Sequence, residues 1–154
     1  MKKIIVALAV VLASFSSEAQ VKTPQSSPMA KIEQVVGLTD VKIEYSRPSA
    51  KGRTVYGDLV PFGKKWRTGA NGNTTISFSE DVTIGGQKLK KGKYALYTTP
   101  KADKWDVIFY TDTNNWGLPE TWDESKVALR TAVKPETLNK SVESFSIFLN
   151  NLSN

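Results

Sequence analysis

Short runs of alternating apolar and polar residues recur along this chain between turn signals rich in Gly and Pro, and no stretch keeps a helical period. Residues 41–46 show the pattern clearly, because Val41, Ile43 and Tyr45 alternate with polar residues, as in a strand with one buried face. Residues 105–110 are apolar or aromatic on both sides near their end, as in a central strand. The pattern predicts an all-β fold, an antiparallel β-sandwich or barrel-like domain of about eight short strands.

Turn residues divide these runs. Gly85-Gly86 separates residues 82–84 from 87–89, and a Gly pair of this kind suits the positive φ angles of a tight hairpin. Gly37 to Asp40 is expected to join the first two strands. The other expected strands are residues 31–36, 74–78, 94–99, 127–133 and 142–149.

The first residues have the pattern of an export signal. Lys2 and Lys3 precede an apolar run, residues 4–15, which is shorter than the ~20 residues that span a membrane. Small residues at Ser17 and Ala19 predict cleavage before residue 20. We therefore expect a signal peptide at 1–19, a flexible leader at 20–29 and a single β domain at 30–154. The predicted location is periplasmic or extracellular, with the mature chain soluble.

His and Cys are both absent from the sequence. Their absence excludes a His-based triad, a Cys nucleophile and a Cys/His zinc site. Any catalysis would have to use Asp, Glu, Lys, Tyr or Ser, and no catalytic residue, metal site or cofactor is predicted. The formal charge of +6, or +5 without residues 1–19, favours anionic partners without specifying one. Nucleic acid is not expected as a partner of an exported protein, and the oligomeric state stays open.

The longest segment without a regular period is residues 49–72. Loops of this length in compact domains are commonly functional, and the aromatic residues Tyr56, Phe62 and Trp66 argue against disorder. Three of the four Arg in the chain, Arg47, Arg53 and Arg67, fall within twenty-one residues of this region.

Two interpretations of this loop remain open. In the first, Arg47, Arg67, Trp66 and Asn71 form a ligand site, because guanidinium, indole and amide groups bind anions and hydroxyl-rich molecules. In the second, the Arg side chains pair with carboxylates or main-chain carbonyls and hold the loop in place, while Trp66 packs in the core. A phosphate loop at residues 69–72 is rejected, because the required spacing and following helix are missing.

A second long loop, residues 111–124, carries Trp116, Trp122 and several carboxylates. Trp116 and Trp122 would offer further stacking faces for a ligand or would cover the end of the sheet. A hydrolase using carboxylates such as Asp58 or Asp123 is an alternative function. A module that docks onto an envelope complex is another.

The segment from residue 35 to 100 resembles a secreted bacterial family known as domain of unknown function 2911 (DUF2911). The resemblance rests on YGDLVPFG, WRTGAN and GKYALYTTP, in this order and at close spacing, and extends over residues 28–151. It implies an exported, mostly β protein of Gram-negative bacteria, and no established activity or substrate. It also implies a further strand after residue 151, whose absence would leave an open sheet edge. The function expected from sequence is binding of a small polar or anionic ligand, such as a glycan or cell-envelope component.

Overall fold

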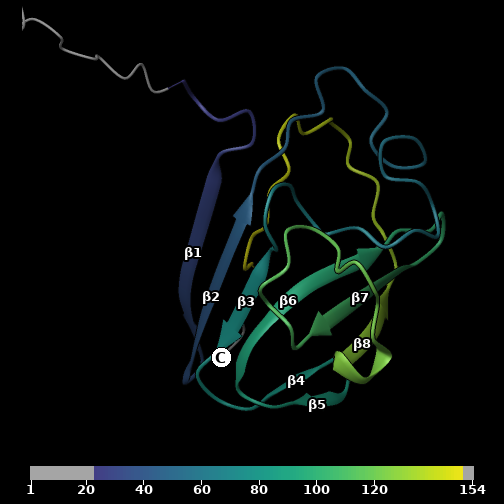
Figure 1. Cartoon of the computed structure of the whole chain (residues 1–154). Coiled ribbons are helices and arrows are strands. Elements are labelled where there is room, and N and C mark those ends of the chain that lie inside the picture. The colour runs from purple at the N-terminus through teal and green to yellow at the C-terminus, as the bar shows by residue number, and fades with distance from the viewer. Residues whose placement is uncertain (1–22, 151–154) are drawn as a thin grey trace, which may run out of the picture.

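The computed structural model describes residues 23–150, so the predicted signal peptide lies outside the described residues. Eight strands form two antiparallel sheets, which confirms the all-β prediction. The larger sheet has the strand order β1-β2-β3-β6-β7-β8, and β4 and β5 form a separate two-stranded sheet (Figure 1). The strands are β1 (Met29–Val36), β2 (Thr39–Ser46), β3 (Thr75–Phe78), β4 (Val82–Ile84), β5 (Gln87–Leu89), β6 (Gly92–Thr99), β7 (Trp105–Tyr110) and β8 (Val127–Val133), with a 3-10 turn η1 (Glu124–Lys126) before β8.

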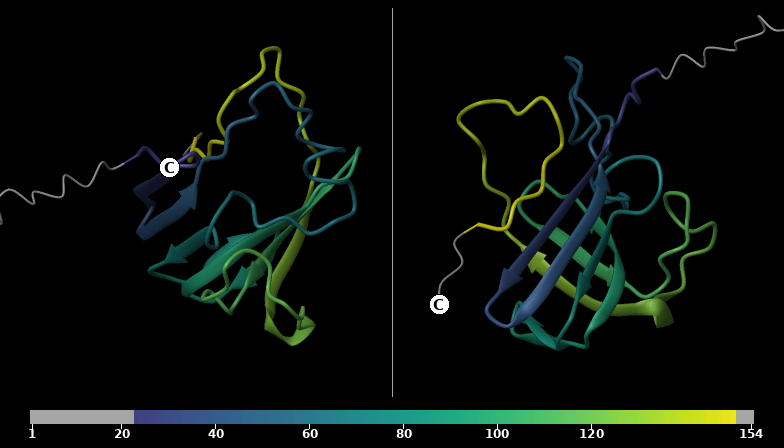
Figure 2. Two further views of the ribbon diagram at one scale, coloured as in Figure 1. Left: turned by 45° about the horizontal axis from the view of Figure 1, so that its top comes forward. Right: turned by 90° about the vertical axis from the view of Figure 1, so that its left-hand side faces the viewer.

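Each strand of the larger sheet pairs with the next one along the chain, apart from the β4–β5 hairpin inserted between β3 and β6. The Gly pair predicted to turn this hairpin does so, with φ angles of 57° at Gly85 and 78° at Gly86. The hairpin is held against β8, where the Gln87 side chain donates a hydrogen bond to the carbonyl of Arg130 at 3.0 Å. The sheet is strongly curved (Figure 2), so it has an inner face and an outer face.

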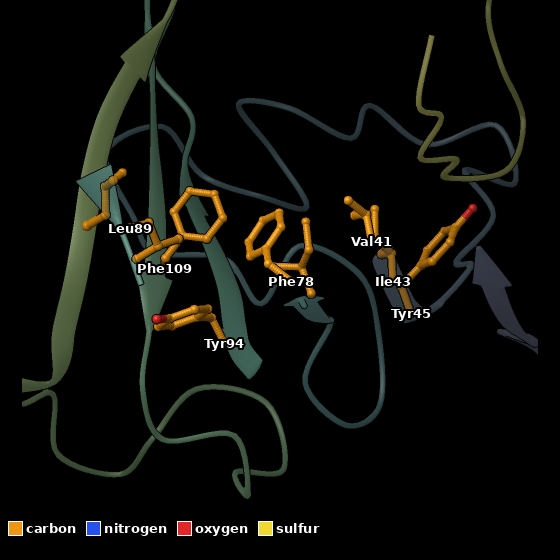
Figure 3. Close-up of a cluster of buried hydrophobic side chains, with 9 residues drawn as sticks. Val41, Ile43, Tyr45, Phe78, Leu89, Tyr94 and Phe109 are labelled. Atoms are coloured by element: carbon orange, nitrogen blue, oxygen red, sulfur yellow. The ribbon is translucent and has the colours of Figure 1, made fainter. Parts of the chain in front are cut away.

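The inner face carries the larger apolar cluster. Residues two apart on a strand point to the same side, so every second residue of a strand can face inward. The buried side chains of the cluster come from β2, β3, β5, β6, β7 and β8. Figure 3 shows Phe78 of β3 between Val41, Ile43 and Tyr45 of β2 on one side and Tyr94 and Phe109 on the other. The complete set of buried residues in this cluster is Val41, Ile43, Tyr45, Ile76, Phe78, Leu89, Tyr94, Phe109 and Leu129.

The outer face carries a second apolar cluster over β6 and β7. There Ala95, Tyr97, Ile108 and Tyr110 form a second buried cluster, with Trp122 of the second long loop packed on it. Trp122 stacks on Tyr110 with ring centroids 4.5 Å apart. The central strands are thus buried on both faces, as the sequence of residues 105–110 predicts.

The expected strand at residues 142–149 is not formed. Only Ser144 makes an isolated bridge, with Ser49, and the rest of this stretch belongs to no sheet. Its amide groups bond elsewhere: Phe145 donates to the carbonyl of Pro48 at 2.9 Å, and Ile147 donates to the hydroxyl of Tyr45 at 3.1 Å. We call residues 134–150 the C-terminal segment. The alternating side chains Phe145, Ile147 and Leu149 still face inward and pack on the inner cluster.

Candidate functional site

Arg47 joins the end of β2 to the C-terminal segment. Its Nε donates to the carbonyl of Phe145 at 3.1 Å, and its Nη2 donates to the hydroxyl of Ser146 at 2.9 Å. Arg53 bonds within its own turn, to the carbonyls of Ser49 and Ala50 at 2.8 Å and 2.9 Å. The guanidinium groups of Arg47 and Arg53 therefore both bond to main-chain carbonyls.

Trp66 and Arg67 are neighbours in sequence but point to different sides. Trp66 pairs through its backbone with Thr98 of β6, donating at 2.7 Å and accepting at 3.0 Å. Its indole lies 5.1 Å from the ring of Phe145, on the inner side. Since successive residues of an extended chain alternate, Arg67 faces the loop that covers the outer side.

Arg67 packs against the second long loop. Its Nη1 donates to the carbonyl of Asn71 at 3.0 Å. A Cβ on Gly117 would lie 2.9 Å from Arg67 Cζ, and Gly117 has a φ of 89°. Only Gly suits both the close approach and the backbone conformation at this position.

Asn71 lines a cavity with a volume of about 570 Å³, which we call the polar cavity. The Asn71 backbone is left-handed, with a φ of 59°. Its side-chain amide donates to the carbonyl of Ser27 at 3.3 Å and to the hydroxyl of Ser46 at 3.4 Å. Other walls come from residues 25–27 before β1, from the end of β2, from Lys93 of β6 and from Thr113 and Trp116 of the second loop.

Glu44 gives the polar cavity a carboxylate held between two ammonium groups. Lys31 Nζ lies 2.6 Å from one Glu44 oxygen, and Lys93 Nζ lies 3.4 Å from the other. The hydrogen bond from Lys31 holds the pKa of Glu44 below its usual value. Glu44 is therefore ionised at neutral pH and can accept hydrogen bonds, while Lys93 can donate them.

The two Trp residues of the second loop have opposite roles. Trp122 packs on Tyr97 and Tyr110, and the ammonium of Lys65 lies 4.6 Å from the centre of its ring. Trp116 is 78% exposed and lies at the polar cavity, with its ring edge near Gly72. An exposed indole beside a polar cavity is a surface on which a planar or ring-shaped ligand can stack.

Asn73 fixes the first long loop to the second. With its amide nitrogen facing the second loop, Asn73 donates to the carbonyls of Asn115 at 2.8 Å and Gly117 at 2.7 Å. The hydroxyl of Tyr97 also donates to the Gly117 carbonyl, at 3.1 Å. This network holds the wall of the polar cavity that carries Trp116.

The carboxylates considered for hydrolysis are placed differently. Asp123 caps η1, where its Oδ1 accepts from the hydroxyl of Ser125 at 2.7 Å and from the Ser125 amide at 2.9 Å. These bonds hold the pKa of Asp123 below its usual value. Asp58 is exposed in the first long loop. Within residues 23–150 no group of three or more Asp or Glu is arranged to hold a metal ion.

The four residues expected to form one site are thus distributed. Asn71 lines the polar cavity, Trp66 lines a second cavity of about 100 Å³, and Arg47 and Arg67 line neither of these two. Glu44 and Lys93 of the polar cavity were not expected from sequence. Their strands, β2 and β6, flank β3 and are far apart in the chain, so no local spacing indicates that they meet.

These features define an all-β protein with a curved antiparallel sheet and a polar cavity between the end of β2 and two long loops. The chain belongs to the family described as Protein of unknown function (DUF2911), whose model matches residues 27–154. This match confirms the resemblance seen in the sequence. No curated protein and no solved structure matches the chain. In the part of the chain that the structure describes, no helix is long and apolar enough to cross a membrane.

Proposed function

We propose that this protein binds a small hydroxyl-rich ligand, such as a sugar unit, in the polar cavity. The observation that carries the proposal is the exposed indole of Trp116 beside a cavity that also holds Glu44, Asn71 and Lys93. The volume of about 570 Å³ falls within the range typical of small-molecule sites.

The donor and acceptor set fits this ligand class. The ionised carboxylate of Glu44 accepts hydrogen bonds from hydroxyl groups, and Lys93 donates them. The NH2 group of Asn71 already bonds to Ser27 and Ser46, so its amide oxygen is the group that Asn71 offers a ligand, as a second acceptor. The face of Trp116 covers the apolar side of a sugar ring. Of the residues expected from sequence, Asn71 keeps a contact role in this proposal, while Arg47, Trp66 and Arg67 support the loops around the cavity.

The proposed setting is outside the cytoplasm, in the periplasm or the extracellular medium. The signal-peptide pattern of residues 1–19 supports export. A glycan or another cell-envelope component is then the natural source of the ligand. A hydrolase function has less support, because Asp123 is ionised and bonded as a cap, whereas a general acid needs a raised pKa.

A thermal-shift screen against sugars, sugar phosphates and short carboxylates tests the proposal. A ligand at a hundred times its Kd is expected to stabilise the protein by about 2.7 kcal/mol. Trp116→Ala should weaken binding at least tenfold, about 1.4 kcal/mol, with little loss of stability, because this side chain is exposed. Asn71→Gly keeps the left-handed backbone and removes the amide, so it should weaken binding as well.

The matched control is Leu38→Ala, which truncates another exposed side chain, 96% exposed, in the turn between β1 and β2. Its binding should equal that of the unmodified protein. A ligand that stabilises the unmodified protein, Trp116→Ala and Asn71→Gly equally would place binding elsewhere. The proposal would be contradicted if no ligand class in the screen stabilised the protein.

A further inference from the structure

The second cavity is small, and its walls are aromatic and aliphatic. It has a volume of about 100 Å³ and shares no lining residue with the polar cavity. It lies between the first long loop and the C-terminal segment, which run side by side at one end of the molecule (Figures 1 and 2). The amide of Ala50 donates to the carbonyl of Glu143 at 2.8 Å and joins the two segments there. We call this cavity the aromatic pocket.

Three rings, those of Tyr56, Trp66 and Phe145, line the aromatic pocket. Trp66 lies 5.1 Å from Phe145 at an interplanar angle of 71°, and 6.0 Å from Tyr56 at 75°. Neighbouring rings therefore meet edge to face, and all three contribute to the lining of the pocket. Trp105 supports Tyr56 from outside the pocket lining, with ring centroids 4.6 Å apart. Aromatic faces carry partial negative charge and attract cations. The attraction is most favourable for a weakly hydrated cation, because little hydration energy is lost when it enters the pocket.

A carboxylate lines the aromatic pocket, and a guanidinium is bonded to residues of its wall. Glu143 lines the pocket, and its Oε1 accepts a hydrogen bond from the amide of Lys51 at 2.9 Å. Arg53 does not line the pocket itself, but its guanidinium is bonded to the carbonyls of Ser49 and Ala50, which do. A simple cation would meet the attraction of Glu143 and the repulsion of Arg53, whereas a zwitterion would complement both.

The pocket volume limits the group that enters. Since a water molecule occupies roughly 30 Å³ in the liquid, about 100 Å³ accommodates a compact group of a few heavy atoms. A trimethylammonium group is compact, weakly hydrated and positively charged. An anionic part of the same ligand would remain outside, near Arg53 and Lys51.

We propose that the aromatic pocket binds the methylated ammonium group of a zwitterion of the phosphocholine or betaine type. The methyl groups contact Tyr56, Trp66 and Phe145, Glu143 balances the positive charge, and Arg53 contacts the phosphate or carboxylate. The ligand is either a free zwitterion or a lipid headgroup, since the two share this chemistry.

Isothermal titration with choline, phosphocholine and the neutral isostere 3,3-dimethyl-1-butanol tests the proposal. We expect choline to bind at least tenfold more tightly than the isostere, because the two differ in charge and not in shape. Phosphocholine should bind more tightly than choline. Arg53→Gln should remove that advantage and leave choline binding unchanged.

Variants of the pocket locate the binding. Tyr56→Leu and Glu143→Gln should each weaken choline binding at least tenfold, while Tyr56→Phe keeps the ring and should retain it. Glu80→Gln, which removes an exposed carboxylate between β3 and β4 that lines neither cavity, is the matched control and should bind choline normally. If Tyr56→Leu does not fold, the other two variants still test the site. Retained choline binding in Tyr56→Phe together with weakened binding in Glu143→Gln would support it, and unchanged binding in Glu143→Gln would contradict it.

Vesicle sedimentation, compared with binding of free phosphocholine, distinguishes the two sources of the ligand. Sedimentation with phosphatidylcholine vesicles, reversed by free phosphocholine, would assign a lipid headgroup. Binding of free phosphocholine without vesicle binding would assign a free zwitterion. Equal affinity for choline and its neutral isostere would overturn the proposal and leave a plain apolar pocket. Absence of binding to choline, phosphocholine and vesicles would overturn it too.

Discussion

Tyr97 is the most enclosed aromatic residue of the outer cluster, with 0% of its surface exposed. Its hydroxyl is not free in this position, since it donates to the carbonyl of Gly117 in the loop above. Burial raises the pKa of Tyr97 to about 12, because the phenolate would lose its hydration in this position. One side chain therefore connects the core to the loop that carries Trp116.

Because the pKa of Tyr97 is raised in the folded protein, we expect the protein to lose stability at high pH. In the unfolded chain Tyr97 ionises near its usual pKa of about 10, while in the folded chain it stays protonated up to about 12. The unfolded state therefore binds fewer protons in this window, and the free energy of unfolding falls as the pH rises from 10 to 12. The loss from Tyr97 alone should approach roughly 2 to 3 kcal/mol.

Chemical denaturation at pH 9, 10, 11 and 12 measures this slope. Tyr97→Phe should lose about 1 kcal/mol at pH 7, through the missing hydrogen bond, and show a shallower alkaline slope than the unmodified protein. Tyr56 and Tyr94 also have pKa values raised by burial, so part of the slope should persist. An identical slope in both proteins would mean that Tyr97 ionises freely in the folded state.

Among the elements, the C-terminal segment shows how an alternating pattern is satisfied outside a sheet. Phe145, Ile147 and Leu149 bury their side chains on the inner cluster, although the backbone joins no strand. Arg47, the carbonyl of Pro48 and the hydroxyl of Tyr45 provide the polar partners that a neighbouring strand would otherwise provide. The segment therefore acts as a cover for the inner face.

Two Phe residues of this segment give a matched pair of substitutions. Phe145→Ala should lower the free energy of unfolding by about 2 to 3 kcal/mol, somewhat below the cost for a fully buried Phe, because the side chain is partly buried. Phe148→Ala should change it by less than about 0.5 kcal/mol, since Phe148 is 71% exposed. Urea denaturation of the two variants checks this difference, and equal effects would show that the segment does not cover the core in solution.

At the scale of the whole molecule, the two apolar clusters share one sheet. Neighbouring residues of β7 divide between them, with Phe109 in the inner cluster and Ile108 in the outer cluster. Unfolding of the strands that carry one cluster would therefore expose the apolar side chains of the other cluster as well. We therefore expect a single cooperative unfolding transition, as small domains usually show.

Substitutions in either cluster test this coupling. Leu129→Ala removes an inner side chain and Ile108→Ala an outer one, and each should cost about 2 to 5 kcal/mol. Far-UV circular dichroism and Trp fluorescence should give the same midpoint in each variant. Separate midpoints for the two probes in the Ile108 variant would show that the loop over the outer face unfolds on its own.

The sequence by itself determined the class of fold and the positions of the eight strands that form. Alternation at residues 41–46 and 105–110, and the Gly pair at 85–86, are local signals, because strand pleat and turn geometry depend on near neighbours. The same alternation at residues 142–149 led to a wrong strand prediction. It reported the burial of Phe145 and Ile147 correctly, but burial on one face does not require a strand partner.

Only the tertiary structure decided which residues share a cavity. Trp66 and Arg67, adjacent in the chain, pack against different segments, Trp66 against Phe145 and Arg67 against Gly117. Glu44, Asn71 and Lys93, by contrast, meet at one cavity from three separate segments. Which of Trp116 and Trp122 has the more exposed indole was equally nonlocal, since Trp122 is partly buried by contacts with Tyr97 and Tyr110. Sites of this kind depend on strand order and on how long loops return to the sheet, and the local pattern of residues carries neither.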